Sequence, residues 1–162
     1  MACVGLAACG GSGGDSRPVL VQHGTLGEGT LAACGDSATL QIAEVTSRIP
    51  ARVTAARFLD ASRGLRAVEV LGYNGPPSLF SDGVAVRPPN GVPISQHTKR
   101  PTVLSVVVAT SCSPNVASGR AKADLVAHKV ELTVVAGGET RTQTLPTGLD
   151  ICVSKVAPGQ CP

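Results

Sequence analysis

Alternation of apolar and polar residues, interrupted by glycine and proline, is the feature that most restricts the fold of this chain. The longest alternating run covers residues 124–135, and shorter runs cover Thr39–Val45 and Arg66–Tyr73. A period of two residues is typical of half-buried β-strands. The residues of the longest run that are predicted to face the core together are Val126, His128, Val130, Leu132 and Val134.

Other segments predict strands by composition and by their turns. Thr102–Thr110 reads TVLSVVVAT and is apolar at both its odd-numbered and its even-numbered positions. These positions point to opposite faces of a strand, so the segment predicts a central strand covered on both faces. The sequence Ala136-Gly137-Gly138-Glu139 supplies residues for the positive φ angles of a tight hairpin. The further strands that we expect are Val19–Val21 at an edge, Ala51–Leu59, Glu139–Leu145 and, last, Leu149–Val156.

A proline-rich segment separates the two halves of this pattern. It contains Pro76, Pro77, Pro88, Pro89, Pro93 and Pro101. Proline lacks a backbone donor and biases the preceding residue toward extended conformations, so a regular ladder is not expected here. Residues 74–101 therefore predict a long crossover loop, and long irregular loops are often functional. The candidate binding loop at its polar tip comprises Gln96, His97, Lys99 and Arg100.

Short strands and a long crossover together predict an all-β fold. We expect a two-layer antiparallel β-sandwich, immunoglobulin-like in architecture only, formed by residues 19–162 as a single domain. Its core must be built from small aliphatic residues, because the 162 residues include only 2 Phe, 1 Tyr and no Trp. The formal net charge is only +3, and the basic residues are scattered. A nucleic-acid partner is therefore not expected.

The N-terminal residues carry a recognisable motif. Leu6-Ala7-Ala8-Cys9 is followed by Gly10-Gly11-Ser12-Gly13-Gly14, and this arrangement resembles the lipobox of bacterial lipoproteins. The resemblance implies that the Cys9 thiol receives a diacylglyceryl group and becomes the mature N-terminus after cleavage. Two acyl chains, such as palmitate, hold a protein stably at a membrane.

The resemblance sets the expected organisation and location of the chain. Residues 1–8 would be the remnant of a signal peptide, and residues 9–18 the lipidated cysteine and a flexible tether. Because the segment before Cys9 has no Lys or Arg and only a short apolar stretch, we expect the true start codon to lie upstream. The protein would be extracytoplasmic, anchored to the cell membrane by its lipid or secreted, with an envelope protein as a further possible partner.

The cysteines agree with export. Of 6 cysteines, cleavage would remove Cys3 and lipidation would modify Cys9. The four that remain for disulfides are Cys34, Cys112, Cys152 and Cys161. Four cysteines allow three connectivities, and their spacing matches no common zinc motif. Of these, the sequence favours Cys112 with Cys152 and Cys34 with Cys161.

No catalytic, cofactor or metal motif is present. The three histidines, His23, His97 and His128, lack ligand spacing, and His128 is expected to face the core. A nucleophilic set could assemble from His97, Asp82 and either Ser81 or Ser95. The hypothesis from sequence is a cell-envelope lipoprotein with a non-catalytic binding or structural role. The alternatives are a small exported hydrolase using Ser, His and Asp, and a metal-handling envelope protein.

Overall fold

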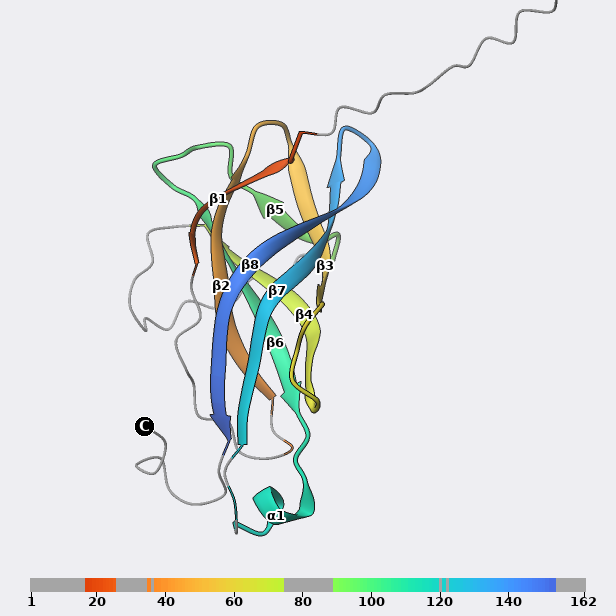
Figure 1. The fold of residues 1–162 in the computed structure, drawn as a ribbon. Coiled ribbons are helices and arrows are strands. Elements are labelled where there is room, and N and C mark those ends of the chain that lie inside the picture. The colour runs from red at the N-terminus through yellow and green to blue at the C-terminus, as the bar shows by residue number, and fades with distance from the viewer. Residues whose placement is uncertain are drawn as a thin grey trace, which may run out of the picture.

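Two antiparallel sheets pack face to face in the computed structural model, which describes residues 17–25, 35, 37–74, 89–119, 121 and 123–153 (Figure 1). Within these residues, the first sheet has the order β1-β2-β6-β4 and the second β5-β3-β7-β8. The first comprises β1 (Leu20–Thr25), β2 (Ser37–Ser47), β6 (Thr102–Thr110) and β4 (Leu65–Asn74). The second comprises β5 (Val92–Ile94), β3 (Ala51–Phe58), β7 (Ala123–Ala136) and β8 (Glu139–Val153). The predicted all-β, two-layer antiparallel sandwich is confirmed.

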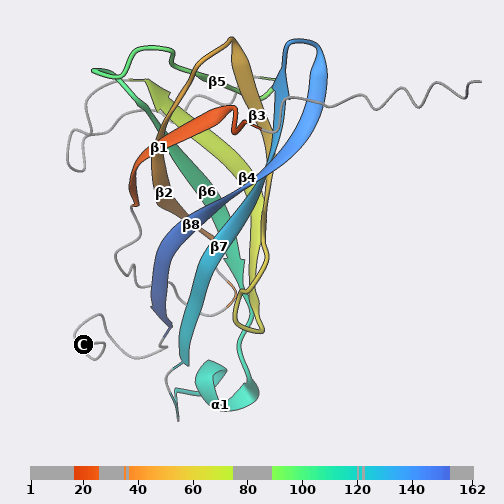
Figure 2. The same cartoon turned by 45° about the horizontal axis from the view of Figure 1, so that its top comes forward.

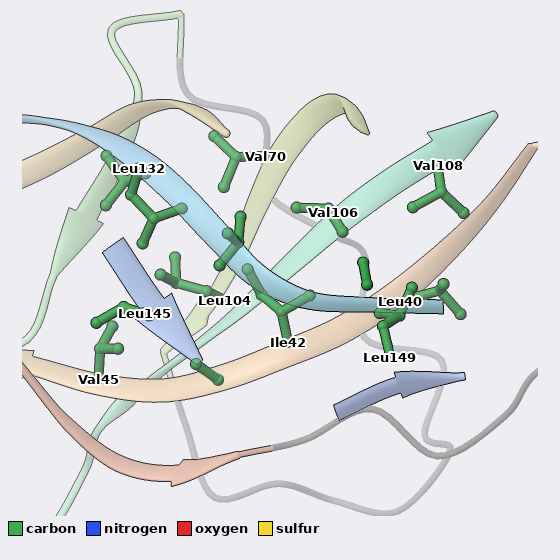
Figure 3. Packing of buried hydrophobic residues seen from close by; sticks show 14 of the residues in the cluster. Leu40, Ile42, Val45, Val70, Leu104, Val106, Val108, Leu132, Leu145 and Leu149 are labelled. Carbon is green, nitrogen blue, oxygen red and sulfur yellow. The ribbon is translucent and has the colours of Figure 1, made fainter. Parts of the chain in front are cut away.

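The core lies between the sheets and is almost entirely aliphatic. Figure 3 shows Leu40 and Ile42 of β2 and Val106 of β6 in the same cluster as Leu132 of β7 and Leu149 of β8. These side chains alternate with exposed ones along most strands, as the period of two requires. Strand β6 differs, because Val103 and Ser105 on its other parity are buried as well as Leu104 and Val106. The prediction of a central strand covered on both faces is confirmed.

Three secondary-structure elements differ from the prediction. The segments expected as two C-terminal strands form one strand, β8, which continues through Pro146. Pro146 is tolerated because β8 is an edge strand within the described sheet, paired only with β7. The expected crossover loop contains β5, a short strand that pairs with the start of β3. A single helical turn, α1 (Pro114–Ala117), lies between β6 and β7, where no strand was predicted.

The predicted position of His128 is wrong. His128 is exposed, whereas Ala127 and Val130 are buried, because the register of β7 against β8 shifts between Ala127 and Lys129. A β-bulge adds one residue to a strand and so moves the following residues to the other parity. The core face of β7 consequently changes from Leu125 and Ala127 before the shift to the even-numbered Val130, Leu132 and Val134 after it.

The strand registers define two ends of the sandwich. At one end, Leu20 pairs with Ser47, Val45 with Thr102, and Ala51 with both Ile94 and Ala136. This end therefore carries the start of β1, the β2–β3 turn, the β5–β6 loop and the β7–β8 hairpin, which Figure 2 shows coming forward together. The hairpin has positive φ at Gly137 (59°) and Gly138 (81°), as predicted. The opposite end carries α1.

Candidate functional site

The candidate binding loop lies between β5 and β6 and is fixed by hydrogen bonds. Ile94, the last residue of β5, is buried, and the Ser95 N–H donates to Thr102 Oγ1 at 2.9 Å. The His97 N–H donates to Ser95 Oγ at 3.1 Å, and the Arg100 N–H donates to the His97 carbonyl at 3.0 Å. The second of these closes a four-residue turn. The loop therefore presents its tip in a defined conformation.

A second loop joins the first at the same end of the molecule. The Ser47 N–H donates to the Ser95 carbonyl at 2.9 Å, and Gln96 Nε2 donates to the Arg48 carbonyl at 3.3 Å. The β2–β3 turn is in turn tightened by Ser47 Oγ, which donates to the Ile49 carbonyl at 2.5 Å. We call residues 48–50 and 95–101 together the basic loop pair.

The basic loop pair concentrates positive charge. Arg48, Lys99 and Arg100 are exposed, as is the His97 ring, and the pair contains no Asp or Glu. Among the described residues, no ion pair involves Arg48, Lys99 or Arg100. The carboxylate of Glu139, in the hairpin at the same end, is paired with Arg141. The surface is thus suited to an anionic partner.

Of the four predicted loop residues, Lys99 and Arg100 contribute positive charge and His97 contributes an exposed imidazole ring. The fourth, Gln96, connects the two loops by its hydrogen bond to Arg48. Sequence reasoning missed Arg48, which contacts Gln96 through its carbonyl. The two residues are far apart in the chain, so only the folded strand order brings them together. The segment Ser47-Arg48-Ile49-Pro50 signals a turn, but nothing in its spacing connects it to the loop.

The histidines do not assemble into a site. His23 Nε2 lies 2.7 Å from Thr46 Oγ1 on the β1 edge, and His97 lies in the basic loop pair. His128 lies in the β7 bulge, where its backbone N–H donates a hydrogen bond to the carboxylate of Asp60. Ser81 and Asp82, considered with His97 and Ser95, lie outside the described residues.

The described part of the chain contains neither a metal-ligand cluster nor a membrane-spanning helix. No group of three His, Cys, Asp or Glu side chains there is arranged to hold a metal ion. None of the helical segments there is long and apolar enough to span a membrane.

The two described cysteines lie in different environments. Cys112 follows β6 and packs against the core cluster. Cys152 lies on β8 between Ile151 and Val153, both of which face the core, so its side chain points to the outer face of the sheet. Neither is a free thiol. Cys9, Cys34 and Cys161 lie outside the described residues.

No protein-family model and no curated protein matches the chain.

Proposed function

We propose that this protein is a bacterial lipoprotein of the cell envelope, anchored outside the cytoplasm through acylated Cys9. Its β-sandwich would serve binding or structure rather than catalysis. The observation that carries the proposal is the lipobox-like Leu6-Ala7-Ala8-Cys9 with its glycine-rich tether, placed a few residues before the folded sandwich begins at β1. Such a tether is what a lipid-anchored domain needs in order to stand off the membrane.

The basic loop pair is the binding surface that the geometry favours. Its cations are exposed, and its backbone is held by the hydrogen bonds around Ser95. A surface that is already ordered loses less conformational entropy when a partner binds. An anionic partner in the envelope is therefore the proposed class of ligand, and gathered cations also raise its rate of association.

Acylation is tested on the protein recovered from its native cells. Mass spectrometry of the N-terminal peptide should show a chain that begins at Cys9 and carries acyl chains. The Cys9→Ser variant should lose the acyl mass and leave the membrane fraction, whereas Cys3→Ser, the matched control, should retain both. A native product with an unmodified Cys9 thiol would overturn the lipid anchor.

We further propose that the four remaining cysteines form disulfides, as an oxidising compartment allows. The strand register supports Cys34 with Cys112. Ser37, at the start of β2, pairs with Ala109 of β6, and each of these cysteines is three residues beyond that pair. Because β2 and β6 are neighbouring strands, the two cysteines are equally distant in sequence from the same strand pair, an arrangement that favours a disulfide between them.

This connectivity differs from the one that the sequence favoured. Cys152 points to the outer face of its sheet, whereas Cys112 packs on the core side. The two side chains therefore face opposite sides of the sheet that contains β8. With Cys34 and Cys112 paired, Cys152 and Cys161 remain, and they are only nine residues apart in the chain.

Peptide mapping without reduction separates these connectivities. Trypsin places Cys34, Cys112, Cys152 and Cys161 on four different peptides: one ending at Arg48, then 100–120, 142–155 and 156–162. We expect the peptide ending at Arg48 to be linked to 100–120, and 142–155 to 156–162. A link between 100–120 and 142–155 would overturn this connectivity, and four alkylatable thiols would overturn the disulfides altogether.

A further inference from the structure

We propose that the basic loop pair rests on an anionic phospholipid surface, with its cations against the headgroup phosphates. This inference rests on the proposed lipid anchor, because the anchor supplies the membrane. It adds an orientation: the sandwich would stand with the β2–β3 turn and the β5–β6 loop toward the lipid and with α1 pointing away.

Charge is the first observation. Arg48, Lys99 and Arg100 project from two neighbouring loops that contain no carboxylate. Arg52, exposed on β3 where it pairs with Pro93 of β5, extends the positive surface. Each basic residue near an anionic membrane adds an attraction that decays within a Debye length, about 8 Å at physiological ionic strength. The cations at one end of the sandwich therefore add to the attraction together only if that end faces the membrane surface.

The chemistry at the loop tips is the second observation. Ile49 is 46% exposed and follows Arg48 directly. An apolar side chain flanked by cations matches the boundary between headgroups and acyl chains, where both are favourable. Because the β2–β3 turn is held by Ser47 to the β5–β6 loop, Ile49 and the cations are presented together.

The position of the N-terminal tether is the third observation. Leu20, at the start of β1, pairs with Ser47, so the chain enters the sandwich at the end that carries the basic loop pair. Eight residue steps separate Cys9 from Arg17, so this stretch can span at most about 29 Å in any conformation. The 11-residue strand β2 alone has a length of roughly 35 Å. The tether therefore keeps this end close to the lipid and the α1 end far from it.

Vesicle sedimentation tests the contact separately from acylation. The full chain carrying Cys9→Ser, which cannot be acylated, is mixed at low ionic strength with vesicles of phosphatidylcholine alone or with phosphatidylglycerol added. We expect binding only to the anionic vesicles, with loss of that binding in high salt. The combined variant Arg48→Gln, Lys99→Gln and Arg100→Gln should bind at least tenfold more weakly.

A matched control removes the same charge elsewhere. Arg63, Arg66 and Lys129 are exposed cations outside the basic loop pair, toward the α1 end. Their combined change to Gln should leave most of the binding intact. Equal loss in both triple variants, or equal binding to neutral vesicles, would overturn the proposal.

Two further outcomes keep the proposals distinguishable. Binding to soluble heparin with none to anionic vesicles would overturn the lipid contact and indicate an anionic polymer as the partner. An acylated Cys9 in native protein together with no vesicle binding would leave the lipid anchor standing and overturn only the orientation. Vesicle binding together with an unmodified native Cys9 would overturn the lipid anchor and leave the contact with anionic lipid standing, because the vesicle assay uses an unacylated chain.

Discussion

At the scale of single residues, Asp60 fixes the bulge that sequence periodicity did not reveal. Its Oδ1 accepts the N–H of His128 at 2.9 Å and that of Lys129 at 2.8 Å, the two residues at the register shift of β7. These donors would otherwise have no ladder partner on this side of the strand. A carboxylate in the β3–β4 turn thus determines which face of β7 the histidine occupies.

The charge of Asp60 makes part of the stability depend on pH. Desolvation acts to raise its pKa, but the N–H groups of Lys129 and His128 and the charge of His128 outweigh this, so the pKa lies below its ordinary value of 3.8. A carboxyl group with a lowered folded-state pKa stabilises the fold above its unfolded-state pKa, about 3.9. That contribution is lost as the pH falls through the folded-state pKa.

We therefore expect Asp60→Asn to lower the urea midpoint at pH 7 and to differ little from the wild type at the lowest pH at which the chain still folds. Urea titrations between pH 2 and 7 measure this. Asp150→Asn is the control, since Asp150 is exposed on β8 and its carboxylate makes no hydrogen bond or ion pair among the described residues. A difference between Asp60→Asn and the wild type that stayed constant with pH would contradict the assignment.

Two serines differ in whether their hydroxyls are used. Ser105 Oγ is buried in β6 without a hydrogen-bond partner, whereas Ser62 Oγ accepts the Val126 N–H at 2.9 Å. An unsatisfied buried hydroxyl costs about 1–3 kcal/mol, and a satisfied hydrogen bond contributes about 0.5–1.5 kcal/mol. We expect Ser105→Ala to raise the free energy of unfolding by about 1 kcal/mol and Ser62→Ala to lower it by a similar amount.

Denaturant unfolding of both variants measures these opposite changes in the free energy of unfolding. A loss of stability in Ser105→Ala would show that its hydroxyl has a partner.

At the scale of elements, the sequence predicted strands far better than it predicted their faces. The type and approximate position of β2, β4 and β7 follow from a local period of two, which a single strand displays by itself, and those of β3 and β6 follow from composition. Bulges depend on the partner strand, and no local pattern marked the one at His128. The strand β5 was missed because the prolines of residues 74–101 argue against a ladder, although Pro93, the one proline within β5, lies on an edge strand where no donor is needed.

The approach of β4 to β5 makes a specific steric prediction. A Cβ atom at Gly72 of β4 would lie 2.0 Å from Cγ1 of Val92, the first residue of β5. Val92 is buried and branched at its own Cβ, so it has little freedom to move. We expect Gly72→Ala to lower the free energy of unfolding by about 1–3 kcal/mol.

Gly148→Ala is the matched control, because a Cβ atom there would meet its nearest neighbour, on Thr25, at 3.8 Å. That is ordinary van der Waals contact, so the change should be small. Urea unfolding of both variants measures the difference. Equal stability of the two would mean that β5 is not held against β4 as described.

At the scale of the whole molecule, the candidate site arises from strand order rather than from any motif. The sequence predicted the β5–β6 loop as a binding surface from its polar tip, but Arg48 joins it only because β2 and β6 are neighbours in the first sheet and β3 and β5 in the second. Register also places the N-terminal entry at the same end. A function that depends on which loops share an end is invisible to local sequence patterns.

A side-chain amide also joins the two sheets, because it makes the pair of hydrogen bonds that a backbone peptide group would make. Gln143 of β8 accepts the Leu20 N–H through Oε1 at 2.9 Å and donates through Nε2 to the Leu20 carbonyl at 2.8 Å. Leu20 belongs to β1 in the other sheet, so this pair of bonds joins the layers at one edge. Gln22 repeats the connection, since its Nε2 donates to the Pro146 carbonyl at 3.1 Å.

We expect Gln143→Ala to lower the free energy of unfolding by about 1–3 kcal/mol, because it leaves both partly buried peptide groups of Leu20 unsatisfied. Gln143→Glu should retain the acceptor but direct a charged oxygen at the Leu20 carbonyl, so its deficit should shrink as the pH falls below about 4.3 and the carboxyl group becomes protonated. Thr144→Ala, at an exposed neighbouring position, is the control and should change stability little. Urea unfolding at pH 7 and pH 4 separates these cases. A Gln143→Glu deficit that does not change with pH would show that the two sheets are not joined through Leu20.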